Sequence, residues 1–271
     1  MPRSGTSLLS GLLHAHSELA IAPETHYFTR CWKGPLVKDE THAQRLLDCL
    51  LQQPGVEDMA FSATESEAVK QAVQAAERPS HRVILTALLD TYARKHHAVY
   101  WGEKTPAHLE HVESIAQVFP EAVFLVVMRD PRDVSLSLRK VPWNHKRTVL
   151  DHAARWAHYA RMVQAYSQDA SINVEVIHYE RLIQAPEAVL RDLCAVLEAE
   201  YEPAMLAGRR PDDANVDPGR EPWKKKALQP IDPTNKEKWK DNMEAFERKV
   251  VQWKAGAEME MWGYPVEEVP W

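Results

Sequence analysis

The chain has 271 residues, which is long enough to bury a full hydrophobic core, and we expect a single domain over residues 1–271. Hydrophobic residues make up 45% of the sequence and charged residues 27%, as in an ordinary soluble globular protein. The formal net charge of −6 argues against a general nucleic-acid or membrane-surface binder, so any basic site must be local.

The first residues predict an anion-binding loop that leads into a helix. Residues 2–7 read PRSGTS, and the leucines that follow recur at helical spacing, which predicts a helix over about residues 6–14. Backbone N–H groups at such a helix start can surround a phosphate. Only the second half of a Walker-type GxxxxGK[ST] motif is matched, because Thr6 stands where the lysine would be and the first glycine would precede Met1. A magnesium-dependent nucleotide triphosphatase is therefore disfavoured.

Helical patterns fill residues 41–97, broken by QQPG at 52–55 and RPS at 78–80, with no convincing strand. We therefore expect a helical insertion over about residues 30–97. The stretch VYWGEKTP (99–106) then predicts a short strand entering a turn. Pro106 can begin a helix that runs to about residue 118.

Strands and helices alternate after the insertion. The run AVFLVVM (122–128) is entirely apolar, which predicts a strand buried on both faces. We expect helices over about residues 132–139, 148–168 and 186–199, and another strand over NVEVIHY (173–179). This order predicts an α/β fold with a mostly parallel sheet, whose ligands lie beyond the carboxyl ends of the strands.

The last part of the chain, about residues 202–271, is expected to form a loop and a helix. The segment GREPWKKKALQPIDP (219–233) is rich in proline and charge, and a helical pattern follows over about residues 234–254. Long irregular loops in compact domains are often functional, so we expect this loop to lie over the ligand.

The cysteines indicate neither a disulfide framework nor a zinc site. Cys31, Cys49 and Cys194 are odd in number and lack CxxC or Cys/His ligand spacing. We therefore expect a reducing compartment and a cytoplasmic location. The sequence has no run of about 18 apolar residues that would predict a membrane span, and no stretch of the signal-peptide type.

Four separated segments resemble the sulfotransferases that use 3′-phosphoadenosine 5′-phosphosulfate (PAPS). They are PRSGTSLL (2–9), APETHYF (22–28), EKTP (103–106) and FLVVMRDPRDVSLSL (124–138), and HYERLIQAPEAVLRDLCAVLE (178–198) extends the match. The likeness is strongest to the bacterial and protein-tyrosine-sulfotransferase-like branch. It implies a three-layer, P-loop-type α/β fold, PAPS as co-substrate and no required metal.

The resemblance also implies which residues bind the nucleotide. The 5′-phosphosulfate would be held by the first loop, through Arg3, Ser4, Gly5, Thr6 and Ser7. Arg129 and Ser137 would hold the 3′-phosphate, although Arg129 could instead form a surface ion pair with Asp130 or Asp133.

Two further nucleotide contacts are less specific. Tyr179 matches a family tyrosine near the nucleotide, but a buried aromatic at this position would serve equally as core. Trp223 and Lys224 resemble the family's late loop that closes on the nucleotide, and simple solvated lysines fit the same pattern.

Two residues match the family's catalytic positions. Glu24 matches the glutamate that takes the acceptor's proton, a role that suits a carboxylate whose site raises its pKa. Lys104 matches a lysine that offsets charge on the leaving phosphate oxygen. In the small-molecule branch a histidine follows the Lys-Thr pair, whereas Pro106 stands there in this chain. Glu24 is therefore the better candidate for the base, with His26 and His108 as reserves.

The prediction is a sulfotransferase that moves the sulfuryl group of PAPS to a hydroxyl or amine of a small-molecule or peptide acceptor and releases adenosine 3′,5′-bisphosphate. A non-catalytic nucleotide-binding relative and a P-loop kinase are the alternatives, and the missing loop lysine disfavours the kinase. The acceptor and the oligomeric state, a homodimer included, stay open. Neither a nucleic-acid partner nor a membrane span is expected.

The resemblance carries one expectation about the sheet. Met1 corresponds to the interior methionine of a Gly-Met-Pro-Arg-Ser-Gly-Thr segment, which the family feeds from a short apolar strand. We therefore expect the first core strand to be missing from this chain, together with about three buried side chains.

Overall fold

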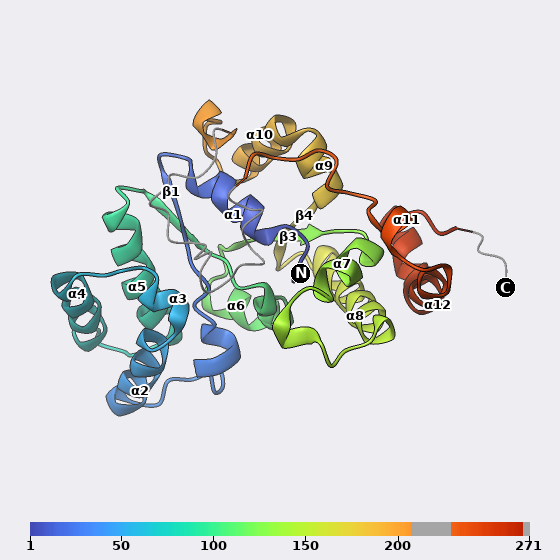
Figure 1. Ribbon diagram of the computed structural model, residues 1–271. Coiled ribbons are helices and arrows are strands. Elements are labelled where there is room, and N and C mark those ends of the chain that lie inside the picture. Colours follow the sequence, from blue (N-terminus) through green and yellow to red (C-terminus); the bar gives the residue numbers. More distant parts are fainter. Residues whose placement is uncertain (207–228, 268–271) are drawn as a thin grey trace. The chain divides into compact units, whose positions relative to one another are not determined.

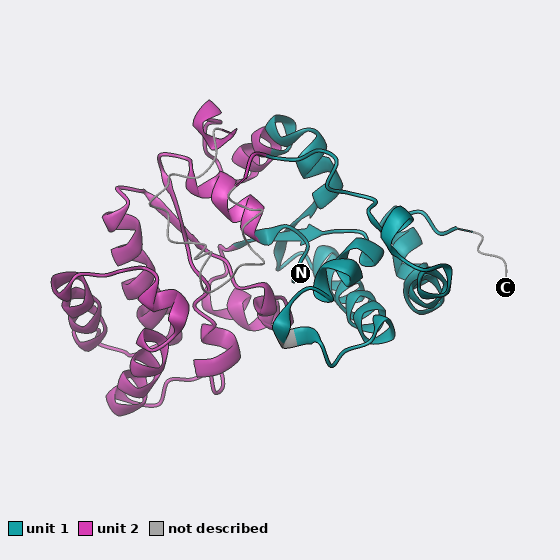
Figure 2. Cartoon of the chain, in the orientation of Figure 1, with its two compact units in different colours: residues 1–6, 123–189, 231–271 teal, residues 7–122, 190–230 magenta. Residues whose placement is uncertain are grey.

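The computed structural model describes residues 1–206 and 229–267, which form two compact units (Figures 1 and 2). Unit 1 contains residues 1–6, 123–189 and 231–271, and unit 2 contains residues 7–122 and 190–230. Each unit holds one pair of parallel strands. The chain is thus an α/β protein, as predicted, and its assignment to a single domain stays a prediction.

The strand pair of unit 2 joins two segments that are far apart in the sequence. β1 (Leu19–Ala22) follows α1 (Thr6–His14) and pairs in parallel with β2 (Tyr100–Glu103). In the register of this pair, Ala22 lies opposite Glu103. The sequence predicted α1 and β2 but not β1. Because the strands are parallel, the residues that follow Ala22 and Glu103 leave the sheet at the same edge.

Helices occupy the sequence between β1 and β2, where the helical insertion was expected. They are α2 (Glu40–Leu51), α3 (Pro54–Glu57), α4 (Ala63–Gln74) and α5 (His81–Lys95), preceded by a single π-helical turn, η1 (Tyr27–Cys31). Serine caps define two of the starts: the Ser62 and Ser80 hydroxyls accept the amides three residues on, at 3.2 and 3.1 Å. Apolar side chains of these helices and of β1 form the hydrophobic core of unit 2.

After β2 the chain turns through η2 (Pro106–His111), a 3₁₀ helix, into α6 (Val112–Val118). Pro106 is the first residue of η2, where its missing N–H costs nothing. The helical stretch predicted after Pro106 is therefore present, in two pieces. Its beginning lies next to η1, so the segments that follow β1 and β2 stay together beyond the sheet.

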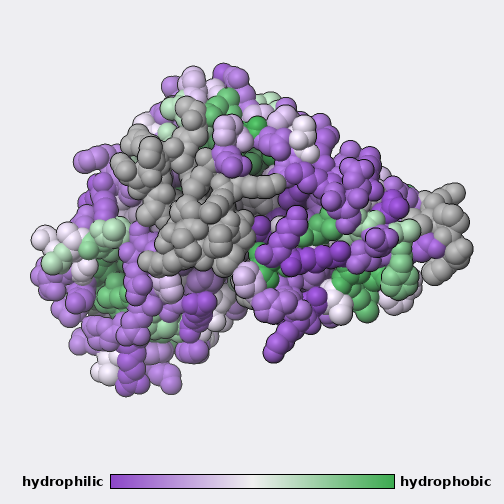
Figure 3. Space-filling view, in the orientation of Figure 1, coloured by the Kyte–Doolittle hydropathy of each residue, from purple (hydrophilic) through white to green (hydrophobic). Residues whose placement is uncertain are grey.

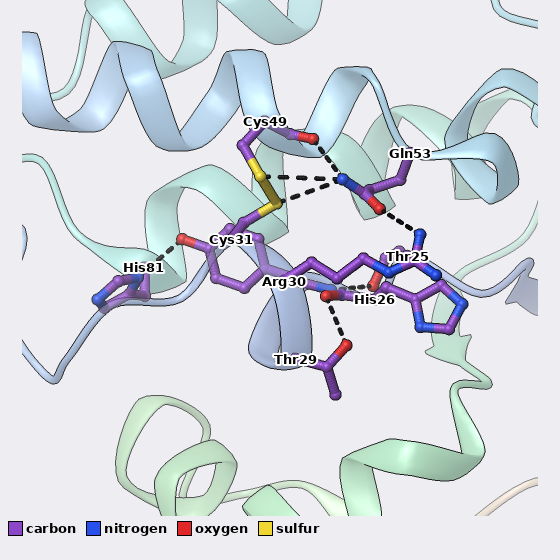
Figure 4. Close-up of a disulfide and its surroundings, with 9 residues drawn as sticks. Thr25, His26, Thr29, Arg30, Cys31, Cys49, Gln53 and His81 are labelled. Carbon is purple, nitrogen blue, oxygen red and sulfur yellow. Dashed lines mark hydrogen bonds between the residues drawn. A yellow bond between two sulfur atoms is a disulfide. The ribbon is translucent and has the colours of Figure 1, made fainter.

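A disulfide between Cys31 and Cys49 ties η1 to α2 (Figure 4). The amide of Gln53 lies beside the bond and donates to the Cys49 carbonyl at 2.8 Å, and Arg30 donates to the Gln53 side-chain oxygen at 3.1 Å. Cys194 is a buried free thiol. The expectation that the cysteines form no disulfide was therefore wrong, because the packing of η1 on α2 brings together two cysteines whose spacing carries no signal.

The sheet of unit 1 consists of β3 (Val123–Met128) and β4 (Asn173–His178), parallel and paired along their whole length. Val126, Val127 and Met128 are buried, whereas the first half of β3 is only partly covered. The expected burial on both faces therefore holds for the carboxyl half of the strand. That half leads into the segment RDPRD.

Helix α7 (Pro131–Leu138) begins directly after β3. The Asp130 carboxylate accepts the Arg132 amide at 2.8 Å and pairs with the Arg132 guanidinium at 2.7 Å. Pro131 is the first helical residue, and the fully buried guanidinium of Arg132 lies 3.5 Å over the ring of Trp239. This anchoring fixes the direction in which the chain leaves β3.

The remaining helices of the described chain follow in order. They are η3 (Pro142–Asn144), α8 (Val149–Gln168), α9 (Tyr179–Gln184), α10 (Pro186–Val196), η4 (Pro203–Leu206), α11 (Trp239–Asn242) and α12 (Ala245–Met261). Within unit 1, α12 packs on α8 and α7.

The last helix differs from its prediction. A single helix was expected over about residues 234–254, but Met243 is extended and separates α11 from α12. The Glu247 side chain then accepts the Glu244 amide at 3.3 Å, which marks a new helix start. As a result α12 runs to Met261, beyond the predicted end.

Most of the face shown in Figure 3 is hydrophilic, with smaller hydrophobic patches. Among the residues that the structure describes, no helix is both long and apolar enough to cross a bilayer.

Candidate active site

The first loop of the chain is shaped by two residues with left-handed backbone. Arg3 has a φ of 63° and Gly5 a φ of 99°, and α1 begins at Thr6. A side chain at Gly5 would overlap the ring of Tyr179, so the loop can rest on this ring only where no Cβ is present. The left-handed backbone of Gly5 and its close approach to Tyr179 both explain why the loop needs glycine at this position.

Arg3 and Ser137 lie together in unit 1. The Arg3 Nε donates to the Ser137 hydroxyl of α7 at 3.0 Å. The sequence had assigned them to different ends of one nucleotide, Arg3 to the 5′ side and Ser137 to the 3′-phosphate. A guanidinium and a hydroxyl in contact provide several donors for an anion.

Arg129 stands at the end of β3 and is held on three sides. Its Nη2 donates to the carbonyl of Asn235 at 2.9 Å and to the Asp133 carboxylate at 3.3 Å, and its guanidinium lies 4.4 Å from the ring centre of Tyr179. The ion pair considered as the alternative role is therefore present, with Asp133. The Arg129 Nε is buried and has no hydrogen-bond partner among the described residues. The guanidinium thus keeps a donor for an anion.

Tyr179 connects Arg129 to the first loop. Its ring contacts both Gly5 and Arg129, and its hydroxyl accepts from the Asn235 side chain at 2.6 Å. Burial raises the pKa of Tyr179, and the nearby Arg129 opposes this only in part. The phenol is therefore neutral, and Tyr179 acts as a packed support for the loop whether or not it also contacts a nucleotide.

The remaining residues of the first loop are Ser4, Thr6 and Ser7. The Ser4 hydroxyl is fully buried and has no hydrogen-bond partner within residues 1–206 and 229–267. Thr6 begins α1, and Ser7, the next residue, belongs to unit 2. Trp223 and Lys224 lie outside the described residues.

The second group of predicted residues lies in unit 2, at the carboxyl edge of its strand pair. Glu24 is two residues beyond β1, and Lys104 directly follows β2. The Lys104 Nζ donates to the Glu24 Oε1 at 2.5 Å, and the two side chains are 11% and 21% exposed. An acid–base candidate and a cation are thus in contact and remain accessible from solvent.

Of the two reserve candidates for the base, His26 and His108, His26 lies next to Glu24. Its Nε2 lies 3.5 Å from the Glu24 Oε2, and its backbone is left-handed, with a φ of 52°. Burial lowers the pKa of His26, although the nearby Glu24 and Glu103 carboxylates oppose that shift. His26 is consequently neutral at pH 7 and can accept a proton.

The contacts of Glu103 at the carboxyl edge of β1 and β2 were not predicted from the sequence. The Glu103 Oε1 accepts from the amide of Thr25 at 2.8 Å and from its hydroxyl at 2.9 Å, and the Glu103 Oε2 lies 3.0 Å from the Nδ1 of His108. His108, the other reserve base, therefore faces a carboxylate. Only the pairing of β1 with β2 reveals this cluster, and β1 was not predicted.

The helical insertion also touches this site. A side chain at Gly55, in α3, would overlap the carbonyl of Glu24, so the backbone of α3 approaches the backbone of Glu24 closely. The disulfide lies a few residues farther along, at Cys31, the last residue of the π-helical turn η1. The segment that carries Glu24 and His26 is therefore fixed on both sides.

Among the described residues, no group of three or more histidine, cysteine, aspartate or glutamate side chains is arranged to hold a metal ion.

Sequence comparison places these residues within a known family. The model of the sulfotransferase family matches residues 1–203. The chain is 25% identical over 210 residues to protein-tyrosine sulfotransferase 1 of Danio rerio, an alignment that covers 76% of this chain and 53% of that protein. The chain thus spans about half the length of that relative.

Solved structures share the fold over almost the whole chain. The sulfotransferase domain from the curacin biosynthetic pathway is 21% identical with a TM-score of 0.68, covering 98% of this chain and 96% of that one. The sulfotransferase domain from the Synechococcus PCC 7002 olefin synthase is 19% identical with a TM-score of 0.71, covering 98% and 93%. These matches confirm the predicted P-loop-type α/β fold.

Proposed function

We propose that this chain, which belongs to the sulfotransferase family, transfers the sulfuryl group of PAPS to a hydroxyl or amine acceptor and releases adenosine 3′,5′-bisphosphate. The observation that carries the proposal is the contact between Glu24 and Lys104, 2.5 Å apart at the carboxyl edge of β1 and β2. Sulfuryl transfer needs a proton acceptor and a positive charge, and these two side chains supply both.

In the proposed reaction, the acceptor oxygen attacks sulfur and the bond from sulfur to the 5′-phosphate oxygen breaks. The acceptor's proton passes to a carboxylate oxygen of Glu24. The electron pair of the broken bond stays on the phosphate oxygen, whose charge Lys104 offsets. The Lys104 ammonium in contact with Glu24 favours the ionised carboxylate, which is the form that can accept a proton, although the same contact makes it a weaker base.

The nucleotide would be held by the residues that the sequence assigned to it. Arg3, Ser4, Gly5, Thr6 and Ser7 would bind the 5′-phosphosulfate, while Arg129 and Ser137 would bind the 3′-phosphate. The buried Nε of Arg129 and the buried hydroxyl of Ser4, both without partners in the described part of the chain, support these roles. Tyr179 would support the loop, and Trp223 and Lys224 would close over the nucleotide.

Binding experiments separate this proposal from the kinase alternative. Adenosine 3′,5′-bisphosphate and ATP with magnesium are titrated into the protein by calorimetry, each with and without EDTA. We expect tighter binding of the bisphosphate, independent of the metal. Equal binding, or a preference for ATP with magnesium, would overturn the proposal.

A transfer assay separates the proposal from a non-catalytic relative. Labelled PAPS is incubated with phenol, sugar, lipid and peptide acceptors, and the labelled products are resolved. The name of the Danio rerio relative makes a tyrosine-containing peptide the first acceptor to test. Binding of the bisphosphate without transfer to any acceptor would favour the non-catalytic alternative.

The structure and the sequence favour different cellular compartments for this protein. The sequence suggested the cytoplasm because the cysteine spacing carries no disulfide signal. The disulfide between Cys31 and Cys49 supports an oxidising compartment instead, because cytosolic thiols are kept reduced. We therefore propose an oxidising location, which mass spectrometry of the alkylated, non-reduced protein from its host can test.

A further inference from the structure

Glu103 binds both of the segments that carry the proposed catalytic residues. It is the last residue of β2, and its side chain is 13% exposed. Its Oε1 accepts from the amide and the hydroxyl of Thr25 and also from the hydroxyl of Thr105. Thr25 directly follows Glu24, and Thr105 directly follows Lys104. The Glu103 Oε1 thus links Thr25, the neighbour of the proposed base, to Thr105, the neighbour of Lys104.

A second hydrogen bond links the same two segments. The amide of His26 donates to the hydroxyl of Thr105 at 3.3 Å, so the segment after β1 contacts the turn after β2 directly as well. The other oxygen of Glu103 lies 3.0 Å from the His108 Nδ1, which anchors the carboxylate to η2. His108 in turn meets the ring of Phe28, in η1, edge to face with ring centres 5.5 Å apart.

We propose that Glu103 is a positioning residue, which keeps the Glu24 carboxylate in contact with Lys104 by holding Thr25 and Thr105. It acts through these two threonines and not on the substrate. The inference rests on the proposed function, since the pair that Glu103 positions is the pair assigned to sulfuryl transfer.

The charge of Glu103 matters for this role. All the groups around its Oε1 are donors, and a carboxylate accepts several hydrogen bonds on one oxygen more strongly than an amide does. Burial alone would raise the pKa of Glu103, but His108, Thr105 and Thr25 outweigh it and hold the pKa below its usual value. The side chain is therefore ionised at pH 7.

The principal test is Glu103→Gln, which keeps the shape and removes the charge. A misplaced catalytic group costs up to about 100-fold in rate, so we expect kcat to fall roughly 10- to 100-fold. The acceptor KM and the Kd for adenosine 3′,5′-bisphosphate should change less than about twofold. Glu113→Gln removes the same charge from an exposed residue of α6, so it is the matched control and should behave as wild type.

A second pair of variants keeps the test decisive if Glu103→Gln folds poorly. Thr25→Val removes one of the bonds to Glu103 with little change in size and should lower kcat, whereas Thr25→Ser keeps the hydroxyl and should restore it. Wild-type kcat in both Glu103→Gln and Thr25→Val would overturn the inference. A loss that Thr25→Ser does not rescue would also overturn it, because the hydroxyl would then have no part in the effect.

Amide hydrogen exchange provides a measurement that needs no activity. In Glu103→Gln the Thr25 and His26 amides should exchange at least about tenfold faster, with the strand amides of β1 unchanged as the internal reference. Unchanged exchange at Thr25 would overturn the positioning role even if the enzyme is active. If the wild type transfers no sulfuryl group to any acceptor, the proposed function fails, and exchange alone decides the role of Glu103.

Discussion

Arg129 combines structural contacts within unit 1 with a proposed role in binding the 3′-phosphate. It pairs with Asp133 and contacts the ring of Tyr179, yet its buried Nε has no partner in the described chain. A residue held this firmly is pre-organised, so it loses little freedom when it binds an anion. Its contacts and its proposed binding role are therefore compatible.

Arg129→Ala should weaken binding of adenosine 3′,5′-bisphosphate by about 1.5–3 kcal/mol, the value of a charged hydrogen bond, while binding of adenosine 5′-monophosphate changes little. Calorimetry with the two ligands measures the difference. Arg129→Lys is the matched control, since it keeps the charge but not the paired donors. Equal losses for both ligands would contradict the assignment to the 3′-phosphate.

Glu24→Gln removes the proposed proton acceptor and keeps the shape of the side chain. Single-turnover transfer from labelled PAPS should slow about 10²-fold or more, with the Kd for adenosine 3′,5′-bisphosphate nearly unchanged. His26, neutral because burial lowers its pKa, lies 3.5 Å away and is the competing base. A fully active Glu24→Gln enzyme would move the role to His26 or His108.

At the level of elements, the disulfide cross-links η1 and α2 across 18 residues of sequence. Closing a loop of this length removes conformational freedom from the unfolded chain, which is worth about 3 kcal/mol. The double variant Cys31→Ser, Cys49→Ser should lose roughly this amount of unfolding free energy in urea titrations. Wild-type protein treated with a reductant should show the same loss, and equal stability of the oxidised and double-variant proteins would contradict it.

The elements that the sequence predicted are those with a strong local pattern. The apolar run of β3 and the leucine spacing of α1 are examples. β1 was missed because its four residues, LAIA, are too few to show a period. The break at Met243 was missed for a similar reason, because the residues on both sides of it favour a helix.

The candidate site was predicted only in part for a different physical reason. Glu24 and Lys104 were found from their motifs, and their contact follows from the parallel pairing of β1 and β2. The network around Glu103 depends on which residues of two distant segments lie opposite each other. That register is set by tertiary packing, so no local pattern could reveal it.

For the molecule as a whole, buried and partly buried histidines make stability depend on pH. Burial lowers the pKa of five of them: His26, His81, His111, His152 and His178. His152, for example, accepts from Asn144 at 2.6 Å and lies 2.9 Å from the Ser135 hydroxyl, so a proton added to it disrupts a buried network.

The sign of the effect follows from the direction of these shifts. A histidine with a lowered folded pKa stabilises the fold fully above its unfolded pKa of about 6.5 and progressively less as the pH falls through the folded pKa. Burial raises the pKa of Asp133 and Glu180, which opposes the trend. We expect the histidines to dominate, so the unfolding free energy in urea should fall between pH 7.5 and pH 5.5. Constant or rising stability over this range would contradict the expectation.

The position of the helical insertion has an evolutionary consequence. Helices α2 to α5 lie in the sequence between β1 and β2, while Glu24 and Lys104 are attached to the ends of those strands. The disulfide joins two points of the same stretch, so it would be inherited together with it. The stretch can thus diverge as a module, changing what approaches Glu24 and Lys104, the proposed catalytic pair, without moving the pair itself. Gly55 is one position at which it is not free to vary, because a side chain there would overlap the backbone of Glu24.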